Sequence, residues 1–279
     1  MLFVMLFEII ALIVLIIAAF TDIKSREVSD WLSWGFIILA LLIRLIMSVM
    51  QYSYLPFLKG ILGFGLFFGI GYLLYRLNQW GGADAKILGG LGALFGIWLG
   101  TSQFMIHFII NLLLVGAAYG IIYGFILVWK HRKKIKIAKL KYTKLLTFTV
   151  LILIIFGMIF LPDLQLKSMF LILLLVIYAM PYVMITLTAL QNQILQRWVS
   201  PSELTEGDWV AKDVIVKGKT ICKRKDNGVS LNQIAKLKRL KVKKVLLIEG
   251  IAFIPSFLIA FILTWMNGNF ITFIIQILR

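Results

Sequence analysis

Two aspartates at the ends of apolar stretches are the residues of this sequence best placed to do chemistry. Asp22 follows the first apolar stretch, and Asp84 directly precedes a later one. Acidic residues are rare at such positions because an ionised carboxylate is costly to place in a membrane. Two carboxylates held together there would share a proton, so that one activates a water molecule and the other hydrogen-bonds a carbonyl oxygen. The ordinary alternative is that Asp22 caps a loop and Asp84 caps the N-terminus of a helix.

The composition places these residues in a membrane protein. The chain has 279 residues, of which 61% are hydrophobic and 15% are charged. Soluble domains are about half apolar and about a quarter charged. A transmembrane helix needs about 20 apolar residues, and we therefore predict an all-α polytopic membrane protein of about eight transmembrane helices with a small cytosolic α+β insertion. The predicted spans are roughly 2–21, 31–50, 56–77, 85–99, 104–129, 146–162, 168–190 and 248–275.

The basic residues indicate how these helices are oriented. Lys and Arg number 29 against 12 Asp and Glu, and with eight spans 25 of the 29 fall in alternate loops. The positive-inside rule assigns those loops to the cytoplasm, which places Asp22 and Asp84 at one depth on the cytoplasmic face of the plasma membrane. If residues 85–129 instead formed one broken helix, the basic loops would be divided between the two faces. We expect no nucleic-acid partner, whereas anionic membrane lipids could bind the basic run 130–145.

Changes in composition divide the chain into four parts. The predicted parts are a transmembrane catalytic core of five helices (1–130), a basic cytosolic loop with two transmembrane helices (131–190), a small cytosolic domain (191–247) and a C-terminal transmembrane helix (248–279).

Two local patterns predict structure in the cytosolic domain. The apolar runs 214–216 and 220–222 flank Gly218 and predict a small hairpin. Ser230 and Gln233 have the spacing of a capping box, which predicts a helix that begins there.

The surroundings of both aspartates resemble a family of proteases. Asp84 lies in Gly81-Gly82-Ala83-Asp84-Ala85-Lys86, which resembles the Gly-x-Gly-Asp motif of the aspartic membrane proteases that mature type IV prepilins and archaeal preflagellins. Asp22 lies in Thr21-Asp22-Ile23-Lys24-Ser25-Arg26-Glu27-Val28, which resembles the first-aspartate motif of that family. The resemblance covers about the first 130 residues. It implies that Asp22 and Asp84 are the catalytic pair and that the motif residues Gly81, Gly82, Ala83 and Lys86 position Asp84.

The resemblance also implies a substrate and a branch of the family. The implied substrates are pilin-like or flagellin-like precursors with a short basic leader that ends in Gly, cleaved at the cytoplasmic face. Bacterial relatives carry a zinc-binding cysteine tetrad and N-methylate the new terminus. Cys222 is the single cysteine here, so the resemblance points to the archaeal branch with one activity and no metal or cofactor. Residues 204–209 and 248–257 are similar to the C-terminal extension of archaeal members, and Ala83 stands where the family motif has Gly.

Three other acidic side chains lie near the predicted membrane spans. Glu27 and Asp30 could attract the basic leader of a substrate to the catalytic pair, or they could simply be solvated loop residues. Glu8 lies within the first span and could pair with Arg44 of the second, because antiparallel helices would bring the two to similar depths.

Two other classes of function remain open at this point. In an ion-coupled secondary transporter the two aspartates would relay ions, although such proteins tend to show internal repeats and midplane charges. Neither feature is visible in the sequence. In a non-catalytic membrane scaffold, residues 191–247 would dock partners.

Overall fold

The structure is a computed structural model that describes residues 2–77, 79–97, 103–133, 135, 143–160, 163–216, 218–224, 226 and 228–268. These residues fall into two compact units, which are described separately. One unit comprises Met1–Gly120 with Trp198–Arg279, and the other comprises Ile121–Arg197.

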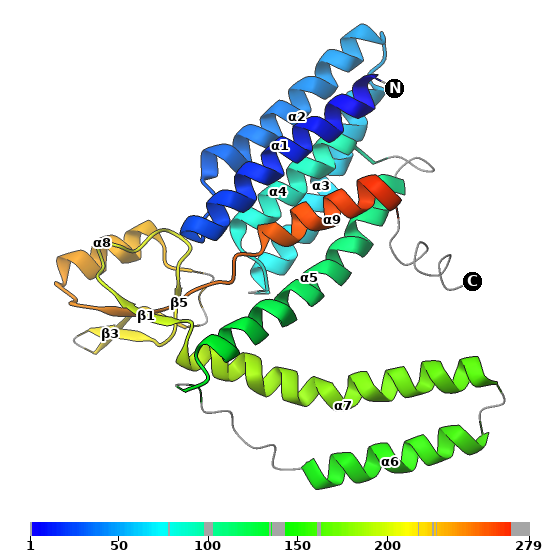
Figure 1. The fold of residues 1–279 in the computed structure, drawn as a ribbon. Coiled ribbons are helices and arrows are strands. Elements are labelled where there is room, and N and C mark those ends of the chain that lie inside the picture. Colours follow the sequence, from blue (N-terminus) through cyan, green and yellow to red (C-terminus); the bar gives the residue numbers. More distant parts are fainter. Residues whose placement is uncertain are drawn as a thin grey trace. The chain divides into compact units, whose positions relative to one another are not determined.

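Helices make up most of the first unit (Figure 1). They are α1 (Leu2–Ser25), α2 (Asp30–Met50), α3 (Leu55–Arg76), α4 (Gly82–Phe95), the first part of α5 (Gln103–Lys130) and α9 (Ile254–Asn267). α4 packs against α2 and α3, and α1 packs against α9.

The predicted polytopic helical architecture is confirmed, but the helices in two of the eight predicted spans are short in the described residues. A helix occupies each of the eight predicted stretches, but six helices are long and apolar enough to cross a membrane in the described residues: α1, α2, α3, α5, α6 (Thr143–Phe160) and α7 (Leu164–Gln193). α4 and α9 have 14 described residues each. Residues 85–129 form two helices, because α4 ends before Gly96, which takes a left-handed φ of 67°.

The last predicted span, 248–275, begins too early. Val245–Ile248 forms strand β5, and helix α9 begins only at Ile254, where Pro255 occupies a favourable first-turn position. The apolar run of β5 continues into the apolar helix, so the hydropathy of the sequence shows no boundary between them. The end of that predicted span, beyond residue 268, lies outside the described residues.

The insertion before α9 contains short strands and one helix. The strands β1 (Gln196–Val199), β5 and β2 (Trp209–Val210) form a sheet in the order β1-β5-β2. β3 (Val214–Val216) pairs antiparallel with β4 (Lys219–Cys222), which confirms the predicted hairpin. Helix α8 (Leu231–Arg239) begins with the predicted capping box, because the Gln233 N–H donates to Ser230 Oγ and the Ser230 N–H donates to Gln233 Oε1. The sequence analysis did not predict the three-stranded sheet of β1, β5 and β2.

The second unit contains α6 and α7, which pack against each other. Gly157 of α6 makes room for a ring of α7, since a Cβ atom there would lie 2.3 Å from Cδ1 of Phe170. A hydrogen bond of 3.3 Å joins the hydroxyl groups of Thr147 and Tyr178.

Glycines set how closely α4 approaches α3. A Cβ atom on Gly63 would lie 2.1 Å from the carbonyl oxygen of Gly92, and one on Gly71 would lie 2.7 Å from Cα of Ala85. Small residues allow membrane helices to pack backbone against backbone, which replaces the hydrophobic driving force that lipid removes. The helix that carries Asp84 is therefore fixed along its length by the backbone of α3.

The substitution Gly63→Ala tests this contact. The added methyl would meet a backbone carbonyl that cannot rotate away, so we expect a loss of about 1–3 kcal/mol of unfolding free energy. Gly65→Ala, in the same helix, is the matched control because a Cβ atom there meets nothing within 4 Å. Thermal unfolding of the two purified variants in detergent would measure the difference, and equal midpoints would contradict the packing described here.

Candidate active site

Asp22 lies in the last turn of α1, where its side chain is 7% exposed. Its Oδ2 accepts a hydrogen bond of 2.9 Å from the backbone N–H of Ile254, the first residue of α9. The first N–H groups of a helix have no partner within the helix and carry a partial positive charge. Asp22 therefore caps a helix that follows it in sequence by more than 200 residues.

The end of α1 explains why Asp22 is held in place. Arg26 has a left-handed φ of 58°, and its N–H donates to the carbonyl oxygen of Asp22 at 2.8 Å. This turn ends the helix one residue earlier, at Ser25, and directs the chain toward α2. The carboxylate thus projects from a closed helical turn rather than from a free loop.

Asp84 lies in the first turn of α4 and is also 7% exposed. Its Oδ2 accepts a hydrogen bond of 2.8 Å from the N–H of Gly81, the residue before the helix. The alternative interpretation of Asp84 as a helix cap is therefore correct as a description of its contact. That contact leaves the carboxylate buried at a helix start, so the capping role and a catalytic role are compatible.

The structure brings the two aspartates together at one end of the first unit. The charge of Asp22 is among the groups that act on Asp84. The Trp80 ring lies 5.8 Å from the Phe253 ring and 5.4 Å from the Phe257 ring, measured between centroids. The chain segment that precedes Asp84 is therefore packed on the same turn of α9 that hydrogen-bonds Asp22. The two carboxylates therefore lie near enough for the charge of one to act on the other.

The other motif residues contribute to the shape and attachment of this helix. A Cβ atom on Gly81 or Gly82 would meet other atoms only at 3.4 Å or more, so neither glycine is required by a close contact in this structure. Ala83 lies within the first turn of α4 and packs against the core. Alanine favours helical backbone over glycine, and the departure from the family motif at Ala83 is thus accommodated.

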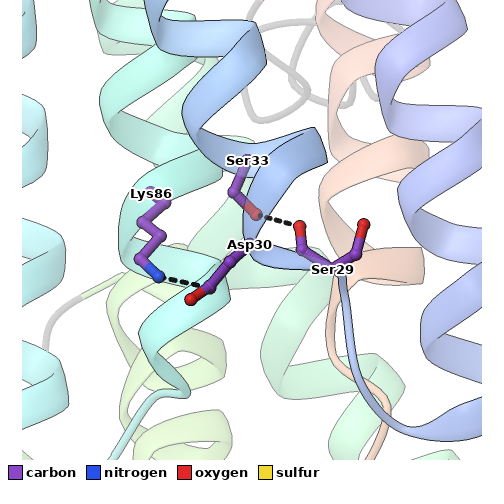
Figure 2. Close-up of polar contacts among 4 residues, drawn as sticks. All are labelled: Ser29, Asp30, Ser33 and Lys86. Carbon is purple, nitrogen blue, oxygen red and sulfur yellow. Dashed lines mark hydrogen bonds and ion pairs between the residues drawn. The ribbon is translucent and has the colours of Figure 1, made fainter.

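Lys86 contacts helix α2 rather than Asp22 or Asp84. Figure 2 shows its Nζ bonded to Oδ1 of Asp30 and the Ser33 hydroxyl donating to the carbonyl oxygen of Ser29. The ammonium group also lies 5.4 Å from the centre of the Trp34 ring. The Asp30 side chain is 77% exposed. Lys86 therefore fastens the start of α4 to the start of α2 while Asp30 remains accessible to solvent.

Glu27 and Arg26 connect the loop after Asp22 to the insertion. Glu27 Oε1 accepts a hydrogen bond of 3.0 Å from the hydroxyl of Thr205. The Arg26 guanidinium donates to the carbonyl oxygen of Gly250 at 2.8 Å and lies 3.9 Å from the Glu249 carboxylate. Sequence reasoning missed these contacts and the role of Ile254, because they join segments far apart in the chain and some use backbone groups, which leave no residue-specific signal.

The expected ion pair between Glu8 and Arg44 is wrong for the described residues, whose ion pairs within 4.0 Å do not include it. Arg44 is 6% exposed, and its Nε donates to the carbonyl oxygen of Leu94 at 2.9 Å. Its guanidinium also lies 4.9 Å from the centre of the Phe7 ring. The carboxyl end of α4 carries unpaired carbonyls and a partial negative charge. Arg44 therefore binds the carboxyl end of α4 rather than the predicted partner, Glu8.

No group of three or more His, Cys, Asp or Glu side chains that could hold a metal ion occurs among the residues with described positions. The candidate site consists of the two carboxylates, the backbone N–H groups of Ile254 and Gly81 that bind them, and the packed rings of Trp80, Phe253 and Phe257, which are close to those N–H groups in the chain.

The fold and this site define a polytopic helical membrane protein with two buried carboxylates at adjoining helix ends. Residues 9–127, which include both aspartates, match the type IV leader peptidase family. This match confirms the resemblance predicted from the two aspartate motifs. It covers most of α1, all of α2 to α4 and most of α5, and it leaves the later helices and the insertion unmatched.

Individual relatives agree with the family match. The chain is 42% identical over 85 residues to a preflagellin peptidase of Methanococcus voltae, an overlap of 30% of this chain and 36% of the relative. It is 35% identical over 86 residues to a preflagellin peptidase of Methanocaldococcus jannaschii, with 31% and 36% covered. The matched region thus spans about a third of the length of these curated relatives. No solved structure matches the chain significantly.

Two substitutions at Asp84 separate its helix-capping role from its charge. Asn keeps an oxygen that can accept the Gly81 N–H, whereas Ala removes it, so we expect Asp84→Ala to lose about 1 kcal/mol of unfolding free energy and Asp84→Asn much less. Chemical or thermal unfolding in detergent would compare the two with the parent. A stability of Asp84→Ala equal to that of Asp84→Asn would show that the hydrogen bond to Gly81 contributes nothing.

Proposed function

We propose that this protein is a membrane aspartic endopeptidase that removes the short basic leader of preflagellin-like or prepilin-like precursors. Cleavage would follow a Gly residue at the cytoplasmic face. The observation that carries the proposal is the burial of Asp22 and Asp84 at adjoining helix ends, within the segment that matches the type IV leader peptidase family. The names of the matching relatives supply the substrate class.

In the proposed reaction one carboxylate acts as the general base and the other as a hydrogen-bond donor. The ionised carboxylate takes a proton from a water molecule as the water oxygen attacks the scissile carbonyl carbon. The protonated carboxyl donates a hydrogen bond to the carbonyl oxygen, which gains negative charge. The tetrahedral intermediate then collapses, the C–N bond breaks, and a proton passes to the leaving amine. Each carboxylate faces a helix N-terminus, which stabilises the one negative charge that the pair carries.

The ends of α2 support a location near the membrane surface. Trp31, at the aspartate end of this helix, is 80% exposed, and Tyr52, just past the opposite end, is 98% exposed. Trp and Tyr concentrate at both membrane–water interfaces. The basic residues Lys24 and Arg76 also lie at the ends of α1 and α3, which supports the cytoplasmic assignment of the catalytic pair.

The two exposed acids beside the pair support a role in binding the leader. Asp30 is largely exposed although its Oδ1 contacts Lys86, and Glu27 lies at the loop that follows Asp22. Their charge would attract the Lys and Arg residues of a leader. We propose that the transmembrane core (1–130) supplies the catalytic pair and that the cytosolic domain (191–247) borders the substrate path through Thr205.

Substitution of either catalytic aspartate tests the proposed reaction. We expect Asp22→Asn and Asp84→Asn to lower the rate of precursor cleavage by at least about 100-fold, because each removes a group that transfers or shares a proton. The assay incubates the purified protein in lipid with a precursor that has a Lys-Arg-Gly junction and sequences the new N-terminus. Asp163→Asn, at the start of α7 in the second unit, is the matched control and should cleave normally. Normal cleavage by either active-site variant would end the proposal.

Charge removal at the two exposed acids tests leader binding separately. We expect Glu27→Gln and Asp30→Asn each to raise KM for a basic leader by roughly two- to fivefold with little change in kcat, as for an exposed charge pair worth up to about 1 kcal/mol. The increase should shrink at high salt. A substrate whose leader has its basic residues replaced by Gln serves as the control. Equal KM changes for both substrates would contradict electrostatic recognition.

A further inference from the structure

The first turn of α9 contacts both halves of the candidate site. Its Ile254 N–H binds the Asp22 carboxylate at 2.9 Å. On the other side, the rings of Phe253 and Phe257 enclose Trp80, which precedes the Gly81 that hydrogen-bonds Asp84. A single turn of backbone therefore links the two aspartates, which belong to α1 and α4.

This turn is held rigidly by its own bonds and by its neighbours. The Ser256 N–H and hydroxyl both donate to the carbonyl oxygen of Phe253, at 2.9 and 2.7 Å. The Phe253 ring fits against Gly116 of α5, since a Cβ atom there would lie 2.8 Å from its Cζ. Phe257 is fully buried and contacts Phe108 of α5 at 6.2 Å between ring centroids. The turn cannot shift without disturbing several helices.

A second hydrogen bond joins α9 to α5 further along the helix. Asn111 Nδ2 donates to Thr264 Oγ1 at 2.9 Å and to the carbonyl oxygen of Gly268 at 2.8 Å. Polar side chains that bond across membrane helices fix their register. α9 is thus anchored on α5 independently of the aspartates, so its first turn can serve as a fixed reference for both.

We propose that, in the endopeptidase reaction inferred above, the first turn of α9 is the third component of the active site and sets the separation and direction of the two carboxylates. Ile254 acts through its N–H on Asp22. Phe253 and Trp80 are positioning residues that hold the Asp84 segment against the same turn. The inference rests on the proposed function for its kinetic consequence, while the contact between Asp22 and α9 can be tested without any assay of activity.

Hydrogen exchange tests that contact directly. We expect the backbone N–H of Ile254 to exchange at least about tenfold faster in Asp22→Asn, since a charge-assisted hydrogen bond is roughly twice as strong as a neutral one. The measurement uses peptic fragments that cover residues 250–257, in which Pro255 has no N–H. Asp30→Asn is the control because Asp30 contacts Lys86 instead. Unchanged exchange in Asp22→Asn would overturn the proposed link between α1 and α9.

Kinetics of aromatic variants test the positioning role. We expect Phe253→Ala and Trp80→Ala to lower kcat by roughly 10- to 100-fold with little change in KM, because small displacements of catalytic groups slow the chemical step more than binding. Trp80→Phe, which keeps a ring between Phe253 and Phe257, should recover most of kcat. Phe156→Ala removes a comparable ring contact in α6 and should leave kcat unchanged.

The outcomes distinguish the positioning role from the function on which it rests. A parent protein that cleaves no precursor overturns the proposed function, and the exchange result then still decides whether Asp22 binds α9. An active parent with kcat within twofold in both Ala variants overturns the positioning role alone. If the Ala variants do not fold, Phe253→Leu and Trp80→Leu, which remove the rings and keep apolar bulk, are judged by the same twofold limit.

Discussion

A buried carboxylate must find hydrogen-bond donors, and in this protein both aspartates find them at the start of a helix. Asp22 binds the first N–H of α9, and Asp84 binds the N–H that precedes α4. An unpaired charge in such surroundings would be costly enough to disrupt the packing. The positions of α4 and α9 therefore follow from the same need that brings the carboxylates together. The partial positive charges of two helix starts meet where a pair of acids would otherwise repel.

The sequence pointed to the two aspartates and to the helix-capping contact of Asp84, but it did not predict what holds Asp22. Asp22 and Asp84 could be found because acids beside apolar spans are rare and because their neighbours resemble known motifs. The short hairpin and the helix at Ser230 could be found because turn and capping patterns are local. The hydrogen bond from Ile254 could not, because it uses a backbone group that every residue except proline has and joins segments far apart in the chain.

One predicted pair of charged side chains is replaced in the structure by a contact with a helix end. Arg44 binds the carbonyl oxygen of Leu94 near the end of α4, where a pair with Glu8 was expected. Pattern counting treats a helix as a row of side chains and omits the partial charges at its two ends. The final span was predicted to start at residue 248 for a different reason, because hydropathy does not distinguish strand β5 from the helix whose start binds Asp22.

The register of α4 against α3 determines how deeply Asp84 is buried. α4 packs antiparallel to α3, with Ala85 opposite Gly71 and Gly92 opposite Gly63. Asp84 therefore lies near the level of Tyr72, and α3 continues to Arg76 for about one more turn, or roughly 6 Å. A shift of α4 by one turn along α3 would carry Asp84 out to the level of Arg76 and expose the carboxylate to bulk water. The observed register instead keeps Asp84 below the neighbouring helix end, where it is buried. The glycines that let α4 approach α3 thus determine the low-dielectric surroundings that two proton-sharing acids require.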